Sequence, residues 1–214
     1  MGTFRGIPTR AFTFYAELAE HNNKPWWNEH KCEYETSVRA PLIELCAALE
    51  DEFGPAKVYR PYRDARFAKD KSPLKDHQGA VIHIEDHVGY YVQVSASGLM
   101  IAGGWYAPQG RQLERYRAAV DTAAGVALER LVAALGKKFE LNGNPLKTKP
   151  KGYDADHPRI ELLRNRMLTA ARNYGDPAWV NTPRTLKVVR DDWRALQPLL
   201  EWLADHVGPG EEPE

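Results

Sequence analysis

Three short segments in the middle of the chain, separated by turns of a few residues, restrict the fold more than any other feature. They are "AVIHIE" (80–85), "YYVQVS" (90–95) and "LMIAGGWY" (99–106). In the first two, successive side chains alternate in character along the segment, as in a strand with two different faces. The connections "DHVG" and "ASG" are the length of hairpin turns, so the segments are predicted to form an antiparallel meander. Alternation then predicts a sheet with one face toward the core and one toward water.

Helical patterns precede the meander. Residues 9–21 and 25–53 repeat apolar side chains every three or four positions, which is typical of helices with one buried face. Pro41 lies inside the second repeat and removes a backbone hydrogen bond, so we expect a kink or break at residues 38–40. The apolar repeat of the second segment consists of Tyr34, Val38, Leu42, Leu45, Leu49 and Phe53.

Helical patterns return after the meander. The chain is therefore predicted to be α+β, with a central antiparallel β-meander flanked by N- and C-terminal helices. We expect residues 1–207 to form a single domain and residues 208–214 to be a disordered C-terminal tail. The later helices are expected near residues 113–120, 124–135, 158–168 and 182–207, with a short strand at "FELNGN".

The charge balance and the cysteines restrict the partners and the cellular location that we expect for the chain. The chain has 29 Lys and Arg against 29 Asp and Glu, so overall charge does not favour non-specific binding to nucleic acid. Cys32 and Cys46 lie about 21 Å apart along one helical stretch, too far for a disulfide, so both are predicted to be free thiols. The start lacks a signal-peptide pattern and apolar runs are short. We expect a cytoplasmic protein without a membrane partner.

Residues 57–75 hold a local excess of positive charge. A spacing of three would align Arg60, Arg63 and Arg66 on a polyproline-type coil, whereas a strand would point Arg63 away from the other two. Guanidinium groups bind carboxylate or phosphate through two parallel hydrogen bonds. The alternative is a solvated edge strand whose charges have no ligand. The cations are Lys57, Arg60, Arg63, Arg66, Lys69, Lys71 and Lys75, against Asp64 and Asp70.

Several stretches resemble a known family. They are "NNKPWW", "VRAPL", "FGPAKVYRPYRDARFAKDKSPLKDHQGA", "GYYVQVSASGLMIAGG", "LERYRAAV", "KGYDADHPRIELLR" and "PLLEWLADHV", and the resemblance covers roughly residues 4–207. In these stretches the chain is similar to the family called domain of unknown function 2461. The resemblance implies that the cations from Arg60 to Lys75, the pair Gly103-Gly104, and Tyr153 with Arg159 belong to the family's signature. It implies no activity.

The meander adds candidate ligand-contacting positions. Gly103-Gly104 inside a strand marks either the close approach of a ligand or tight packing against a helix. Tyr91 and Gln93 share one face of the neighbouring strand and are expected to line the same hollow.

Two further clusters have side chains of the kinds used in metal binding and acid–base chemistry. His83, Glu85 and His87 would share a strand face, but the ligand set is incomplete, so we expect no metal site. Asp156-His157 offers an acid–base pair, although an aspartate before a helix more often serves as its N-cap. The sequence lacks a Gly-rich phosphate loop, a nucleophile elbow and a paired-cysteine motif, and we expect no cofactor.

The leading hypothesis is therefore a basic pocket for an anionic small molecule bearing phosphate or carboxylate, with or without catalysis. The alternative is a binding module that uses the same basic stripe for nucleic acid or an acidic protein. The sequence leaves open the choice between enzyme and binder, the ligand and the oligomeric state. The candidate ligand-binding residues are Arg60, Arg63, Arg66, Lys69, Lys71, Lys75, Tyr91, Gln93, Gly103, Gly104 and Arg159.

Overall fold

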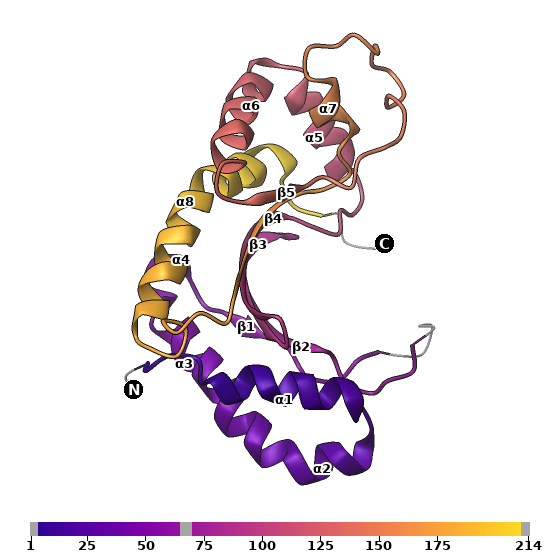
Figure 1. Cartoon of the computed structure of the whole chain (residues 1–214). Helices are drawn as coiled ribbons and strands as arrows, with labels where there is room; N and C mark the ends of the chain where they lie inside the picture. The colour runs from indigo at the N-terminus through magenta and orange to yellow at the C-terminus, as the bar shows by residue number, and fades with distance from the viewer. Residues whose placement is uncertain (1–3, 65–69, 211–214) are drawn as a thin grey trace. The chain divides into compact units, whose positions relative to one another are not determined.

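The computed structural model describes residues 4–64 and 70–210 of the chain (Figure 1). The fold is α+β, with helices beside a six-stranded antiparallel sheet of order β1-β2-β3-β4-β6-β5. The predicted meander is confirmed as β2, β3 and β4, at the centre of the sheet. The strands are β1 (Lys57–Val58), β2 (His77–Glu85), β3 (Val88–Ser95), β4 (Gly98–Trp105), β5 (Glu140–Asn142) and β6 (Leu168–Gly175).

The chain groups into two compact units. The first consists of Met1–Ile82, Tyr91–Ile101 and Asn173–Asp191, and the second of His83–Tyr90, Ala102–Arg172 and Asp192–Glu214. Strands β2, β3, β4 and β6 supply residues to both units, as does the long C-terminal helix α8 (Arg184–Val207). The single domain expected for residues 1–207 stays a prediction.

The first unit begins with two helices, α1 (Thr9–Glu20) and α2 (Lys24–Glu33), which lie side by side in Figure 1. Phe14 of α1 joins them, because its ring contacts Trp26 and Trp27 of α2 at centroid distances of 5.4 and 6.4 Å. Asn23 caps α2 by accepting a hydrogen bond from the backbone N–H of Trp26 at 3.1 Å.

A π-helical turn, η1 (Tyr34–Arg39), occupies the position where the sequence predicted a kink. Helices α3 (Ala40–Ala47) and α4 (Glu50–Phe53) follow it. A π-turn accommodates Pro41 because it widens the helix just before the residue that lacks an N–H. The apolar repeat keeps its register through this turn, since Tyr34, Val38, Leu42, Leu45, Leu49 and Phe53 are all buried.

The second unit packs its helices around aromatic side chains. Its helices are α5 (Gln112–Val120), α6 (Ala123–Leu135), α7 (Ile160–Arg164) and the later part of α8. Tyr116 of α5 lies between Trp105 and Trp202, at centroid distances of 5.3 and 6.2 Å. The indole of Trp202 also donates to the carbonyl of Ala124 at 3.0 Å. These contacts explain why the tryptophans are buried.

The segment 158–175 differs from the sequence prediction. The helix expected over 158–168 is restricted to α7, and β6 follows it, paired with β5 through Ala170 and Leu141. Pairing in the sheet here overrides a sequence that is rich in helix-forming residues. The proposed N-cap role of Asp156 was also wrong, because α7 begins after Arg159 without a side-chain cap.

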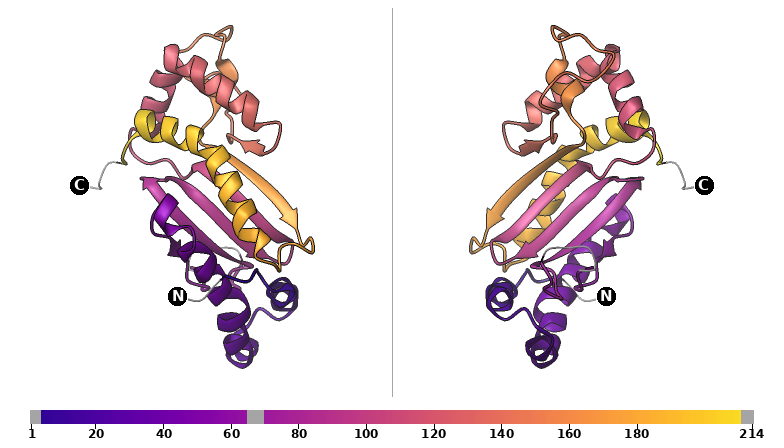
Figure 2. Two further views of the ribbon diagram at one scale, coloured as in Figure 1. Left: turned by 90° about the vertical axis from the view of Figure 1, so that its left-hand side faces the viewer. Right: turned by 90° about the vertical axis from the view of Figure 1, so that its right-hand side faces the viewer.

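The two faces of the sheet carry different side chains. Tyr90 of β3 contacts Trp193 of α8, and a Cβ at Gly103 of β4 would lie 3.1 Å from Leu200 of α8. Figure 2 shows α8 along this covered face. Alternation places Tyr91 and Gln93 on the opposite face, where both are partly exposed. The expected alternation is incomplete, because small residues such as Ala102 are buried on the open face too.

Other sequence expectations concern the thiols and the chain ends. Cys32 is exposed and Cys46 is buried, and both are free thiols, as predicted. Within residues 4–64 and 70–210, none of the helices has both the length and the apolar character needed to cross a bilayer. In the expected tail, the carbonyl of Gly208 accepts from Gln112 at 2.8 Å, and residues 211–214 lie outside the described part.

Candidate functional site

The basic stretch is a two-stranded arm of the first unit. We call residues 59–64 and 70–76 the basic arm; Arg66 and Lys69, two of the predicted site residues, lie outside the described residues. The two sides of the arm run antiparallel and join at the bridge Tyr62–Leu74. Backbone hydrogen bonds from Arg63 to the Pro73 carbonyl (2.9 Å) and from Lys75 to the Pro61 carbonyl (2.8 Å) flank this bridge.

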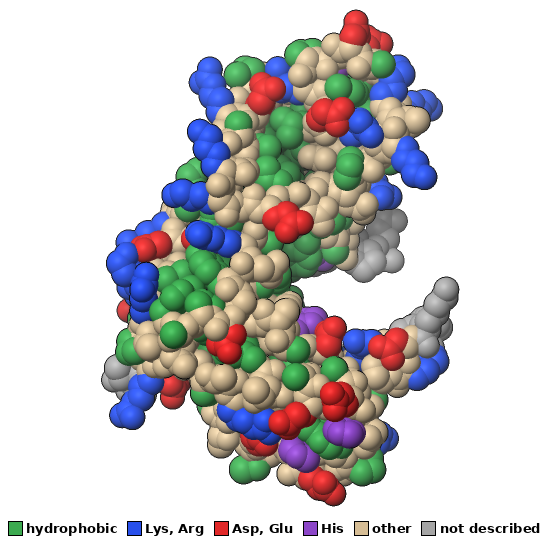
Figure 3. Space-filling view, in the orientation of Figure 1, with side chains coloured by type: hydrophobic (Ala, Val, Ile, Leu, Met, Phe, Trp, Pro, Cys, Tyr) green, Lys and Arg blue, Asp and Glu red, His purple; other side chains and the backbone are tan. Residues whose placement is uncertain are grey.

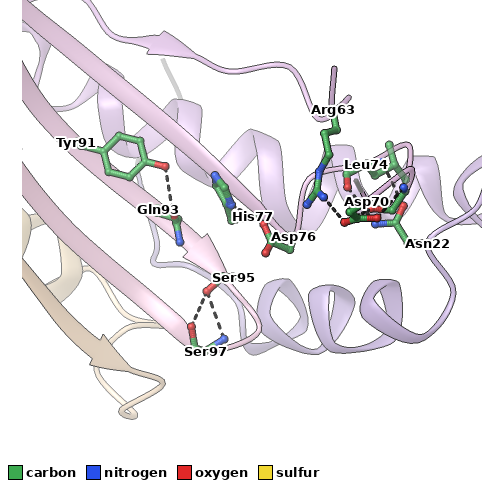
Figure 4. A network of polar contacts seen from close by, with 11 residues as sticks. Asn22, Arg63, Asp70, Leu74, Asp76, His77, Tyr91, Gln93, Ser95 and Ser97 are labelled. Atoms are coloured by element: carbon green, nitrogen blue, oxygen red, sulfur yellow. Dashed lines mark hydrogen bonds and ion pairs between the residues drawn. The ribbon is translucent and has the colours of Figure 1, made fainter. Parts of the chain in front are cut away.

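One side of the basic arm is fixed against α1 and α2. Leu74 is buried, and its backbone exchanges two hydrogen bonds with the Asn22 side chain, at 3.0 and 3.1 Å. The hydroxyl of Tyr62 accepts from the Trp27 indole at 3.3 Å. Figure 4 shows Asn22 beside Leu74. The arm therefore has a defined position within the first unit, and alternation points Arg63 and Lys75 away from the Leu74 side.

Arg63 is paired inside the arm. Its guanidinium contacts the Asp70 carboxylate (Figure 4). The same carboxylate accepts from the backbone and hydroxyl of Ser72 at 2.9 and 2.8 Å. The Ser72 hydrogen bonds, and secondarily Arg63, hold the pKa of Asp70 below its usual value. Asp70 thus stays ionised and neutralises part of the charge of Arg63.

Lys75 and Arg60 have a different environment. The ammonium of Lys75 lies 5.1 Å from the ring centroid of Tyr59, a distance that permits a cation–π contact. Partial burial lowers the pKa of Lys75, and the neighbouring positive charge of Arg60 lowers it further. Among the described residues, neither cation is hydrogen-bonded or ion-paired to a carboxylate. Two like charges therefore lie near each other without a compensating acid in the part of the chain that the structure describes.

An aspartate–histidine pair lies where the basic arm enters β2. The Oδ1 atom of Asp76 is 2.7 Å from Nδ1 of His77 (Figure 4). The hydrogen bond from His77, followed by the charges of His77 and Arg63, keeps the pKa of Asp76 below its usual value. The side chain of His77 is 33% exposed, so its ring is open to solvent on one side.

Tyr91 and Gln93 form the adjoining part of the open sheet face. The Tyr91 hydroxyl donates to Oε1 of Gln93 at 2.9 Å, so the Gln93 amide nitrogen is directed elsewhere (Figure 4). Tyr91 fits only because residue 79 is glycine, since a Cβ there would lie 2.8 Å from Cζ of the ring. Burial raises the pKa of Tyr91, and the charge of Asp76 adds to that effect. His77 and Gly79 alternate onto the same side of β2, which places the imidazole on the Tyr91 face.

Three predicted site residues belong to the second unit. Arg159 donates to the carbonyls of Val120 and Asp121, at 2.7 and 3.3 Å, and so satisfies the C-terminal end of α5. Gly103 leaves room for α8, and a side chain at Gly104 would overlap the backbone of β6. Gly103 thus packs against a helix, one of the two alternatives that the sequence left open, whereas Gly104 packs against a strand, and the ligand-binding role of both glycines stays a prediction. Lys71 is an exposed residue of the basic arm.

The other sequence clusters have structural contacts. His83 is hydrogen-bonded to the Tyr106 hydroxyl at 2.5 Å, and His87 packs edge-on against the same ring. In the described part of the chain, no three His, Cys, Asp or Glu side chains gather as a metal site. His157 is 3.0 Å from the Asp121 carboxylate.

Sequence reasoning missed the Asp76–His77 pair. The signal was present as an Asp-His dipeptide before a strand, but the same dipeptide occurs at 86–87, 156–157 and 205–206. Composition alone does not single out one of these four. The distinguishing property is position, because only the structure shows His77 beside Tyr91 and Gln93 (Figure 4).

The charge distribution argues against one continuous basic stripe. On the face of the molecule in Figure 3, the described Lys and Arg side chains are interspersed with Asp and Glu. In the basic arm itself, Asp70 pairs with Arg63, and the side chain of Asp76 is 73% exposed. The described cations thus border a small open face.

Taken together, the sheet, its helices and this polar face define an α+β protein with an open face bordered by cations. A family model described as "Conserved hypothetical protein (DUF2461)" matches residues 10–202. The chain belongs to this family, as its sequence motifs suggested. No curated protein and no solved structure matches the chain.

Proposed function

We propose that the chain binds a small anionic molecule, bearing phosphate or carboxylate, on the open face of the first unit. The binding residues are Arg60, Lys75 and, in part, Arg63 of the basic arm, with Tyr91 and Gln93 of the sheet. The observation that carries the proposal is the pair Lys75 and Arg60, two neighbouring cations that lack a carboxylate partner among the described residues.

The charge of this pair favours a ligand. Placing an ammonium in a partly buried position next to a guanidinium costs free energy, and the lowered pKa of Lys75 reflects that cost. An anion bound at Lys75 relieves this repulsion and gains charge-assisted hydrogen bonds. Groups held in an unfavourable electrostatic arrangement occur more often at functional sites than elsewhere.

The side chains next to the two cations offer further contacts to a ligand. With its oxygen engaged by Tyr91, the carboxamide of Gln93 offers N–H donors to a ligand. Tyr59, beneath Lys75, offers an aromatic surface. Arg63 is already paired with Asp70, so its contribution to binding is smaller than that of Lys75. The roles predicted for Arg66, Lys69, Lys71, Gly103, Gly104 and Arg159 stay predictions.

A thermal-shift screen tests the proposal. Sulfate, inorganic phosphate and citrate are added to the full chain at constant ionic strength, with chloride as reference. We expect at least one of them to raise the melting temperature of the wild type, because a ligand that binds only the folded state stabilises it. We expect no such rise in Lys75→Met and an undiminished rise in Lys31→Gln, a control lysine on the exposed side of α2.

A gel-shift experiment separates this proposal from the nucleic-acid alternative. A protein that binds the phosphate backbone does so most tightly at low salt, because its binding releases counterions. If the site takes a small anion instead, single-stranded and duplex oligonucleotides should show no gel shift even at low salt. A melting temperature that none of the three anions changes would contradict the proposed site.

A further inference from the structure

We propose that His77 is the general base of a hydrolytic centre for phosphate monoesters, and that Asp76 is its positioning residue. The inference deepens the proposed anion site and rests on it. Its structural basis is the position of the Asp76–His77 pair, between the basic arm and the polar face formed by Tyr91 and Gln93 (Figure 4).

The hydrogen bond between the two side chains fixes the tautomer of His77. An ionised carboxylate is only an acceptor, so Nδ1 must carry the proton that it donates to Asp76 at 2.7 Å. The lone pair of the neutral ring is then on Nε2, on the edge directed away from Asp76. An oriented imidazole of this kind is the usual arrangement of a general base with its supporting carboxylate.

The groups around the pair keep the Asp76 carboxylate ionised, as an acceptor for the Nδ1 proton of His77. Arg63 lies close enough in the basic arm to stabilise the carboxylate, and Tyr15 of α1 and Tyr91 of β3 face it from the other packed elements. Both tyrosines stay protonated at neutral pH because burial raises the pKa of each hydroxyl. The nearest fixed charges to the carboxylate are thus cationic, and a neutral Asp76 is disfavoured.

The site charge favours a phosphate monoester over a ligand that carries a single carboxylate. A phosphate monoester carries nearly two negative charges at neutral pH. Lys75 and Arg60 supply two positive charges without an acid of their own among the described residues. A single carboxylate would leave one of these charges uncompensated.

The proposed step balances without an oxidant or cofactor. Nε2 of His77 takes a proton from a water molecule while the water oxygen forms a bond to phosphorus. The bond between phosphorus and the ester oxygen breaks, and the leaving oxygen takes the electron pair. The imidazolium then returns the proton to that oxygen, so one ester and one water become one alcohol and one inorganic phosphate.

The experiment uses the full-length chain with p-nitrophenyl phosphate as substrate. It compares the wild type with His77→Gln and Asp76→Asn. We expect hydrolysis by the wild type, with a rate that rises with pH as an imidazole loses its proton. In His77→Gln, kcat should fall by about 10²–10⁴-fold, the usual contribution of a general base, and the pH-dependent rise should disappear. Asp76→Asn should lower kcat with little change in KM.

A matched control lies in the turn that follows β2. His87 belongs to a second Asp-His dipeptide, and its ring packs against Tyr106. His87→Gln removes this histidine. Its kcat should equal that of the wild type. Inorganic phosphate binding is measured calorimetrically for each variant, and His77→Gln should retain it.

The outcomes separate the two proposals. Phosphate binding without hydrolysis, or hydrolysis that His77→Gln leaves unchanged, overturns the catalytic inference and leaves the anion site. A wild type that does not bind phosphate overturns the anion site itself. If His77→Gln does not fold, a long-range ¹H–¹⁵N spectrum of the wild type tests the inference by showing which ring nitrogen of His77 carries the proton. Neutral His77 should be protonated at Nδ1, and protonation at Nε2 overturns the inference.

Discussion

The ring of Tyr91 on β3 lies across the backbone of Gly79 on β2, so close that a Cβ at position 79 would be 2.8 Å from Cζ of the ring. This contact brings the Tyr91 hydroxyl to Gln93 and shapes the open face beside His77. A glycine within a strand is destabilising by itself. Its presence here is explained by the space that the tyrosine requires.

The first prediction concerns this contact. Gly79→Ala should lower the free energy of unfolding by about 1–3 kcal/mol, the usual cost of adding a methyl group to a filled space. Urea unfolding followed by circular dichroism measures the change. In the background of Tyr91→Ala, which empties the space, Gly79→Ala should cost little. Equal costs in both backgrounds would show that the two residues are not coupled.

The second prediction concerns the buried hydrogen bond between Tyr34 of η1 and Gln78 of β2. The Tyr34 hydroxyl donates to Oε1 of Gln78 at 2.5 Å, and both residues are buried. Tyr34→Phe should cost about 1–3 kcal/mol, because the Gln78 oxygen loses its donor without access to water. A loss of less than a few tenths of a kcal/mol in urea unfolding would mean that water replaces the hydroxyl.

These two contacts illustrate what the sequence does and does not determine. The meander was predictable, because alternation and short turns are local properties of residues 80–106. The disruption ahead of Pro41 was predictable for the same reason. Strand β6 was not, because Leu168–Gly175 becomes a strand through pairing with distant partners in β5. The Tyr91–Gly79 contact likewise depends on two strands meeting.

The candidate site was predictable only in part. The sequence proposed Arg60 and Lys75 from the local excess of charge and Gln93 from the strand face that it shares with Tyr91, and their role in binding stays a prediction. It did not show that Asp70 neutralises Arg63, since that pair depends on the fold of the arm around Ser72. The Asp76–His77 pair was missed because its dipeptide is repeated elsewhere in the chain.

The third prediction concerns pH. The pKa of Lys75 is lowered in the folded protein, so the unfolded chain holds the proton up to a higher pH, about 10.4. Lys75 therefore destabilises the fold at neutral pH, and this penalty disappears as pH rises through the interval between the two values. Lys75→Met should be at least as stable as the wild type at pH 7, with the difference shrinking as the pH rises toward about 10.4. A variant less stable at pH 7 would contradict this account.

The fourth prediction concerns the two thiols. Burial raises the pKa of Cys46 to about 12, whereas Cys32 is exposed. A thiol with a high pKa in an apolar environment reacts slowly, because the thiolate is the nucleophile. The disulfide reagent DTNB should thus modify one cysteine rapidly in the native chain and both in urea. Rapid modification of both in the native state would show that Cys46 is accessible.

The central claim is that Lys75 and Arg60 hold an anion, and calorimetric titration with inorganic phosphate tests it most directly. The wild type and the control Lys31→Gln should show the same saturable binding. Lys75→Met should weaken binding by about tenfold or more, because one charge-assisted hydrogen bond contributes about 1.5–3 kcal/mol. Equal affinity in Lys75→Met and the wild type, or no binding by either, would contradict the claim.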